Sequence, residues 1–155
     1  MTFRSVLIAN RGEIAIRIAR ACSELGLRSV AVFSEDDDAS LHTRMADEAV
    51  ALTGHGVKAY LDGAQLIDVA KAHGCEAVHP GYGFLAENAG FARACEQAGL
   101  IFIGPSLDVL EGFGDKSAAR ALAERCEVPL IKGINRSVSL TEARAFLDEH
   151  GPLMI

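Results

Sequence analysis

Several features that would point to a particular class of protein are missing from this chain of 155 residues. It has no tryptophan and four cysteines, and the cysteines form neither a Cys-X-X-Cys pair nor a Cys/His cluster with the spacing of a zinc site. No apolar run approaches the ~20 residues that a helix needs to cross a bilayer. These absences argue against a structural zinc domain and against an integral membrane protein.

A basic surface is missing as well. The chain carries 15 Lys and Arg against 21 Asp and Glu, and its net charge of −6 at pH 7 comes entirely from residues 1–113. A domain of this sign has no electrostatic footprint for nucleic acid or for an anionic membrane surface. Four of the acids are consecutive at residues 35–38, and we interpret this run as a solvated loop.

Export and transit signals are not found either. The sequence begins directly with a strand pattern, without a basic segment, an apolar signal core or an Arg-rich transit segment. Cys22 and Cys95 fall on apolar faces of predicted helices, where a reduced thiol behaves as a small hydrophobic group. These observations predict a cytoplasmic protein.

What is present is a hydrophobic share of 50%, in a chain long enough to bury the core of one ordinary domain. Short apolar runs with the composition of buried strands occur at residues 5–9, 29–33, 47–52, 75–79 and 100–103. Helical patterns separate most of these runs, and strands joined by such helices form right-handed parallel units. The predicted fold class is therefore α/β, with an open, mostly parallel, doubly wound, Rossmann-like sheet and helices on both faces.

Apolar residues at three- and four-residue steps predict the helices of this sheet. The first helix is expected to end at Gly26, which can close it in a left-handed conformation. The predicted buried stripes are Ile14, Ile18, Ala21, Cys22 and Leu25 in the first helix, Leu66, Val69, Ala70 and His73 in the second, and Phe91, Ala94, Cys95 and Ala98 in the third.

The pattern changes after residues 112–114 (GFG), and we place a domain boundary near residue 113. Residues 1–113 then form a first domain, and residues 114–155 form the beginning of a second. In the second, the capping-box signature at residues 139–142 (SLTE) opens a helix that Gly151 and Pro152 end. An earlier helix is marked by Ala118, Ala121, Leu122 and Cys126. Residues 151–155 resemble a strand that is just beginning, so we expect the sequence to be cut at 155.

Ligands of open parallel sheets gather beyond the carboxyl ends of the strands, where three turns stand out. The turn at residues 10–13 (NRGE) has one glycine where a dinucleotide site needs three, so NAD binding is disfavoured. The glycine-rich turn at residues 79–84 (HPGYGF) either aims an aromatic ring into a cleft or is a tight turn with Tyr82 and Phe84 in the core. His79 has no identifiable carboxylate partner, which favours a structural histidine over a general base.

Lys116 follows the third turn, at residues 112–115, and lies at a predicted helix start, where backbone N–H groups and a cation favour phosphate. Lysines at such positions are usually just solvated, so the signal is weak by itself. Arg17, Arg20 and Glu24 fall at i, i+3 and i+7 of the first predicted helix. This polar stripe is either ordinary exposed surface with an Arg20–Glu24 pair or a charged subunit interface.

Four segments occur in the order seen in biotin carboxylases: residues 8–15 (IANRGEIA), 79–88 (HPGYGFLAEN), 102–105 (FIGP) and 114–116 (GDK). The chain resembles this family over essentially its whole length, and the second segment is the most specific. The resemblance implies the α/β domain that precedes an ATP-grasp domain. Biotin carboxylases of this kind are components of acyl-CoA, pyruvate and urea carboxylases.

The family's enzymes are ATP-dependent carbon–nitrogen ligases, and the resemblance implies the same reaction here. ATP, with Mg²⁺ or Mn²⁺, converts bicarbonate to carboxyphosphate, and biotin on a carrier domain is then carboxylated. A carboxyltransferase domain or subunit uses the product, and a homodimer or larger assembly is expected.

The same resemblance assigns roles to individual residues. Lys116 matches the lysine that contacts the ATP phosphates, and Tyr82 lies on the loop that faces biotin. Arg17, Arg20 and Glu24 match positions at the homodimer interface. The family's catalytic and metal-binding residues match nothing within these 155 residues, so the segment alone is predicted to be inactive.

Two other functions remain as alternatives. Another ATP-grasp ligase would share the fold but lack the segment at residues 79–88, whereas a non-catalytic nucleotide-binding or dimerisation domain would use the first-helix stripe as its interface. Lys132 stands where the family often has a proline, which leaves the subfamily open. The final carboxyl acceptor and the architecture of the parent protein are likewise left open.

Overall fold

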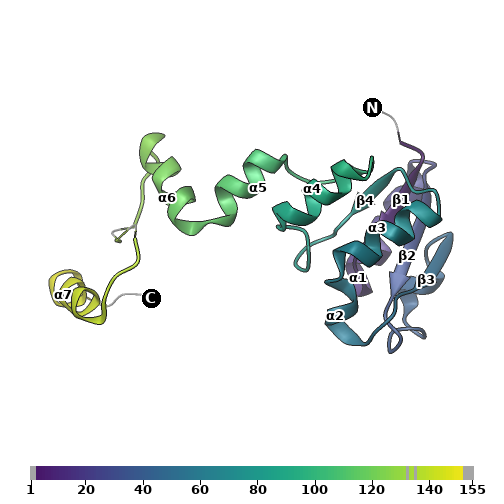
Figure 1. The fold of residues 1–155 in the computed structure, drawn as a ribbon, viewed down its shortest axis with the longest axis horizontal. Helices are drawn as coiled ribbons and strands as arrows, with labels where there is room; N and C mark the ends of the chain where they lie inside the picture. The colour runs from purple at the N-terminus through teal and green to yellow at the C-terminus, as the bar shows by residue number, and fades with distance from the viewer. Residues whose placement is uncertain (1–2, 132, 135, 152–155) are drawn as a thin grey trace. The chain divides into compact units, whose positions relative to one another are not determined.

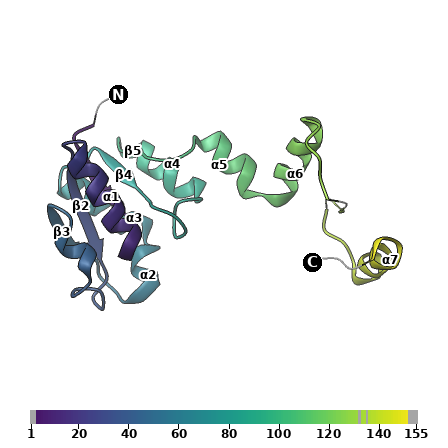
Figure 2. The ribbon, with the colours of Figure 1, turned by 180° about the vertical axis from the view of Figure 1, so that it is seen from behind.

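The computed structural model describes residues 3–131, 133–134 and 136–151. The chain divides into two compact units, Met1–Glu111 and Gly112–Ile155. The first unit holds a five-stranded sheet in which every strand pairing is parallel, in the order β3-β2-β1-β4-β5 (Figures 1 and 2). Its strands are β1 (Ser5–Ile8), β2 (Arg28–Phe33), β3 (Glu48–Ala51), β4 (Ala77–His79) and β5 (Ile101–Phe102). The predicted α/β class and the five predicted strands are confirmed.

Helices cover both faces of this sheet. Alternate residues of β1 point to opposite faces, so the strand contributes to a hydrophobic cluster on each side. Val6 and Ile8 pack with α1 (Gly12–Glu24), whereas Leu7 packs in a second cluster with residues of the helices on the other face. Those helices are α2 (Gly56–Tyr60), α3 (Gly63–Ala72) and α4 (Ala89–Gln97). Figures 1 and 2 show α3 and α1 on opposite sides of the sheet. The doubly wound arrangement is therefore confirmed.

The predicted stripe of the first helix is correct at Ile18 and Cys22 and wrong at two positions. Ala21 is exposed, and Leu25 is 73% exposed because α1 ends at Glu24 and Leu25 lies at its C-cap. Ala15 and Ala19 complete the buried face instead, together with the two residues predicted correctly. Gly26 has φ +68° and reverses the chain as expected.

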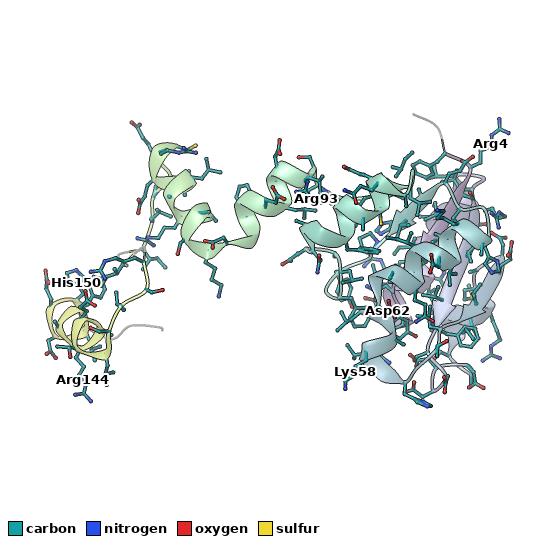
Figure 3. The ribbon with its side chains drawn as sticks, viewed as in Figure 1. Arg4, Lys58, Asp62, Arg93, Arg144 and His150 are labelled. Carbon is teal, nitrogen blue, oxygen red and sulfur yellow. The ribbon has the colours of Figure 1, made fainter. Side chains whose placement is uncertain are left out.

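Some elements have no counterpart in the sequence analysis, and two of them are very short. The 3-10 helix η1 (Leu41–Arg44) buries His42, whose Nε2 lies 3.1 Å from the Val32 carbonyl oxygen. Helix α2 buries Tyr60 completely. Asp62 then caps α3, with its side chain accepting the Gln65 N–H at 3.0 Å, and Figure 3 labels this residue between the two helices. Both elements are too short to show a helical repeat, so periodicity does not reveal them.

The remaining helices are α5 (Leu107–Gly114), α6 (Lys116–Arg125) and α7 (Leu140–His150). The expected turn at residues 112–114 is wrong, because these residues complete α5 and the interruption is Asp115, the N-cap of α6. The predicted capping box is confirmed, since Glu142 N–H donates to Ser139 Oγ at 3.3 Å and Ser139 N–H donates to Glu142 Oε2 at 2.8 Å. Pro152, the apolar end at residues 152–155 and Lys132 lie outside the described residues.

Candidate functional site

The strand order reverses at β1. Strands β2 and β3 continue on one side of β1, whereas β4 and β5 lie on the other side. The loops that follow β1 and β4 leave the same edge of the sheet, because the two strands are parallel neighbours. Open α/β sheets bind ligands at such a switch point, beyond the carboxyl ends of the strands.

A pocket of about 390 Å³ lies between these two loops. Its volume falls within the range of roughly 300–1,000 Å³ that is usual for small-molecule sites. The structure thus brings together two of the turns that the sequence singled out, although Glu13 and Tyr82, which meet there, are 69 residues apart in the chain. The lining residues are Asn10, Arg11, Gly12, Glu13, Ile14, Tyr82, Gly83 and Phe84.

Asn10 joins the two loops from beneath the pocket. Its buried side-chain amide donates to the Pro80 carbonyl oxygen at 2.7 Å and to the Tyr82 carbonyl oxygen at 2.9 Å. Its Oδ1 accepts the Arg11 N–H at 2.9 Å. Gly81 has φ +69°, and a Cβ there would lie 2.6 Å from Asn10 Nδ2, so both residue types are required for the loops to meet.

The two aromatic residues of the β4 loop have different environments. Tyr82 is 61% exposed, and its hydroxyl donates to Glu13 Oε1 at 3.0 Å. This hydrogen bond and the charge of Glu13 raise the pKa of Tyr82. Phe84 is half-buried and stacks on Tyr60, with ring centroids 5.4 Å apart. The core-filling interpretation therefore holds for Phe84 and is wrong for Tyr82.

His79 ends β4 beside this loop. Its Nδ1 accepts the Gly81 N–H at 3.0 Å, and burial lowers the pKa of the imidazole. A neutral ring that receives a backbone hydrogen bond stabilises the turn, as expected of a structural histidine.

The acidic run at residues 35–38 is not simply a solvated loop, which corrects the sequence interpretation. The Asp37 side chain is only 17% exposed and accepts hydrogen bonds from Arg11 and from the Tyr60 hydroxyl. Asp36 accepts the Gly56 N–H at 2.7 Å. The loop after β1 and helix α2 bring these donors to the run, and they are distant in sequence from it. A run of like charges therefore does not predict these contacts.

Lys116 is the first residue of α6 and is exposed. Its neighbour Asp115 caps the helix by accepting the Ala118 N–H at 2.8 Å. The predicted position at a helix start is confirmed. Its role toward phosphate stays a prediction, and Lys116 belongs to the second compact unit.

Arg17, Arg20 and Glu24 are all exposed on α1. The ion pairs of the described residues do not include the predicted Arg20–Glu24 pair. Arg17 also borders an apolar groove of about 460 Å³ that runs along the helix. The interface role of the stripe stays a prediction.

The described part of the chain contains no group of three His, Cys, Asp or Glu residues that could hold a metal ion. Among residues 3–131, 133–134 and 136–151, no helix has the length and apolar character needed to cross a membrane.

All four cysteines are free thiols, and burial raises the pKa of the Cys75 thiol to about 11.

Some residues of the site were not expected from the sequence. Sequence reasoning missed Asp37 and Tyr60, and it considered Asn10 and Glu13 only for dinucleotide binding. The sequence does mark Asn10 and Glu13, because both lie in the segment IANRGEIA that resembles the family.

Comparison with known proteins places this geometry in a family. The family model described as the biotin carboxylase N-terminal domain matches residues 2–110. Mitochondrial pyruvate carboxylase of Rattus norvegicus is 53% identical over 152 residues, which is 96% of this chain and 13% of that protein. The chain therefore spans about an eighth of the length of this relative.

Two solved structures share the fold. The biotin carboxylase domain of a single-chain bacterial carboxylase is 61% identical with a TM-score of 0.90, over 95% of this chain and 34% of that one. The biotin carboxylase domain dimer of Hydrogenobacter thermophilus 2-oxoglutarate carboxylase, solved with MgADP, ADP and bicarbonate, is 43% identical with a TM-score of 0.92. That match covers 98% of this chain and 34% of the other. The chain belongs to the biotin carboxylase N-terminal domain family.

Proposed function

We propose that the chain is the amino-terminal part of an ATP-dependent biotin carboxylase. The enzyme uses ATP to activate bicarbonate as carboxyphosphate and then carboxylates biotin on a carrier domain. The observation that carries this proposal is the pocket at the switch point, which is built from the two sequence segments that most resemble the family. In this proposal residues 1–113 are the first domain, and residues 114–155 open an ATP-grasp domain.

Two features of the pocket support the binding of the planar ureido group of biotin. Gly83 has open space where a side chain would lie, so a ligand can approach its backbone closely. Tyr82 supplies an aromatic ring at the rim of the pocket. The hydrogen bond from the Tyr82 hydroxyl to Glu13 restrains that ring. We assign Tyr82 to the biotin-facing loop on these grounds.

Lys116 is proposed to bind the ATP phosphates, because an exposed cation at a helix start adds its charge to that of the backbone N–H groups. Mg²⁺ or Mn²⁺ would neutralise charge on the phosphoryl oxygens. The described residues hold no group that fits such an ion, so its ligands are proposed to lie outside this segment. The catalytic residues are proposed to lie outside it as well.

The assembly is also a proposal. A structural neighbour is a biotin carboxylase dimer, which supports a homodimer here. We propose that Arg17, Arg20 and Glu24 lie at its interface, because all three are exposed on α1. A carrier domain and a carboxyltransferase domain or subunit would be the further partners. A cytoplasmic location completes the proposal.

The test is the biotin dependence of ATP hydrolysis in the complete protein that carries this chain. ADP release in the presence of bicarbonate should rise when free biotin is added, and carboxybiotin should accumulate. The 155-residue segment alone should show no such activity. ATP hydrolysis that ignores biotin would favour another ATP-grasp ligase, and a stable dimer without nucleotide binding would favour a non-catalytic domain.

A further inference from the structure

The Asp37 carboxylate lies behind the pocket and contacts one of its walls directly. Its Oδ2 accepts a hydrogen bond from Arg11 Nη1 at 3.0 Å, and Arg11 lines the pocket. The Asp37 side chain is 17% exposed and that of Arg11 is 40% exposed, so the ion pair is partly shielded from water. Such partial shielding reduces the screening by water and salt that makes fully exposed ion pairs weak.

The same carboxylate is linked through Tyr60 to a second residue of the pocket, Phe84. The Tyr60 hydroxyl donates to Asp37 Oδ2 at 2.8 Å and accepts the Ser34 N–H at 3.1 Å. The ring of Tyr60 is fully buried and stacks on Phe84, with an angle of 10° between the ring planes. Phe84 lines the pocket from the β4 loop.

Both walls need such support. Phe84 has φ +36°, a backbone conformation that is strained for an aromatic residue and persists only where its surroundings impose it. The Arg11 guanidinium carbon lies 5.8 Å from the centre of the Tyr60 ring, so the same tyrosine contacts Arg11 as well as Phe84. Arg11 and Phe84, which line the pocket from two different loops, are therefore both held by Tyr60 and by the carboxylate that fixes it.

The Asp37 carboxylate accepts hydrogen bonds at both of its oxygens. Ser40 Oγ donates to its Oδ1 at 3.1 Å, in addition to the Arg11 and Tyr60 donors at Oδ2. Burial raises the pKa of Asp37, but the hydrogen bonds from Arg11, Tyr60 and Ser40 together outweigh burial, and the pKa lies below its usual value. The residue therefore stays ionised at neutral pH and keeps its hold on Arg11.

We propose that Asp37 is a positioning residue for the pocket between the β1 and β4 loops. It fixes Arg11 of the β1 loop and, through Tyr60, Phe84 of the β4 loop, and so it sets how tightly the site binds its ligand. The inference rests on the proposed function, because it takes that ligand to be the biotin ring.

The test compares Asp37→Asn with Asp36→Asn in the complete protein that carries this chain. Asp36 is a matched control because it is the neighbouring acid of the same loop and bonds to Gly56 rather than to a pocket residue. Asp37→Asn should raise the KM for free biotin by about tenfold to a hundredfold, the range expected for the loss of one hydrogen bond to a charged group. The KM for ATP should stay within about twofold, and Asp36→Asn should change neither value.

Two further variants separate positioning from general stability. Tyr60→Phe keeps the ring that stacks on Phe84 and removes the hydroxyl, so it should raise the KM for biotin by less than Asp37→Asn does. Asp37→Glu restores the charge and should recover part of the lost affinity. If Asp37→Asn fails to fold, the Tyr60→Phe result decides the question.

An unchanged KM for biotin in Asp37→Asn or in Tyr60→Phe would overturn the proposal, as would an equal rise in the KM for ATP or an equal effect of Asp36→Asn. The proposed function is tested separately by the unaltered protein. If that protein shows no biotin-dependent ATP hydrolysis, the function is wrong whatever the variants do.

Discussion

The side-chain amide of Asn10 donates to the Pro80 carbonyl oxygen at 2.7 Å and so joins two loops that are 70 residues apart. The same amide also donates to the Tyr82 carbonyl oxygen. Asparagine suits this position because it carries two N–H donors and a carbonyl acceptor on one short side chain. Both walls of the pocket therefore depend on one buried side chain.

Gly81→Ala tests this junction. Alanine at this position would have to adopt a left-handed backbone conformation, and its Cβ would lie 2.6 Å from Asn10 Nδ2. The free energy of unfolding should therefore fall by about 2–4 kcal/mol. Gly83→Ala is the matched control, because Gly83 has φ +63° but open space around the Cβ position, and only about 1–2 kcal/mol should be lost. Urea denaturation followed by circular dichroism measures both, and equal losses would show that the Asn10 contact is unimportant.

Tyr82→Phe removes the hydroxyl that donates to Glu13 and keeps the ring. Because both side chains are exposed, stability should change by less than about 0.5 kcal/mol. The KM for free biotin should rise by roughly twofold to tenfold, because the ring loses its hydrogen bond to the Glu13 carboxylate and this exposed bond contributes only modestly. Steady-state kinetics of the complete protein measure the KM for biotin. A rise confined to the KM for ATP would contradict the proposal that Tyr82 faces biotin.

Lys116→Ala should weaken the use of ATP by ~1–3 kcal/mol, the loss expected for a charged hydrogen bond to phosphate. The readout is kcat/KM for ATP at saturating bicarbonate and biotin. Lys71→Ala is the control, since Lys71 is an exposed lysine in the last turn of α3. ATP kinetics that are the same in both variants would remove Lys116 from the phosphate site.

Arg20→Glu tests the first-helix stripe as a dimer interface. The reversed charge should repel its former partners and raise the dissociation constant of the homodimer by about tenfold or more. Lys58→Glu makes the same change on α2, where Figure 3 labels the side chain at the lower end of the view. Sedimentation velocity distinguishes the two, and a dimer that withstands Arg20→Glu would place the interface elsewhere.

Acidification should loosen the start of α7. The Arg136 hydrogen bond and then those of Ser139 lower the pKa of Glu142 to about 2. A carboxyl whose pKa is lowered in the folded state stabilises that state above its ordinary pKa of 4.5 and ceases to do so as the pH falls toward 2. NMR Cα shifts of residues 140–143 should lose helical character over this range, whereas Glu142→Gln should show no such transition.

The sheet could be predicted from the sequence because its strands are almost entirely apolar. Runs such as residues 5–9 and 29–33 have no polar face, which is typical of parallel strands that helices cover on both sides. The buried face of the first helix is predictable at Ile18 and Cys22 but not at Leu25. The reason is that a stripe defines which residues share a face but does not show where the helix ends.

The candidate site was predictable only in part. The two glycine-bearing turns could be found, because both follow buried strands and parallel neighbours end at the same edge. The Asp37–Arg11 pair could not be found, since it depends on how the loop after β2 folds back toward the loop after β1. The contrast between Tyr82 and Phe84 depends on Tyr60, which lies in a helix too short to be recognised.

The central position of β1 also has a consequence for biosynthesis. Strand β1 is synthesised before the other strands of this sheet and can pair with β2 soon afterwards, but its other edge has to wait for residues 77–79 of β4. Until then the backbone of an apolar strand is open on one side, the state in which nascent chains associate wrongly. The partners of Asn10, Pro80 and Tyr82, are also synthesised about 70 residues after it, so the pocket between the two loops cannot form until the β4 loop has been made.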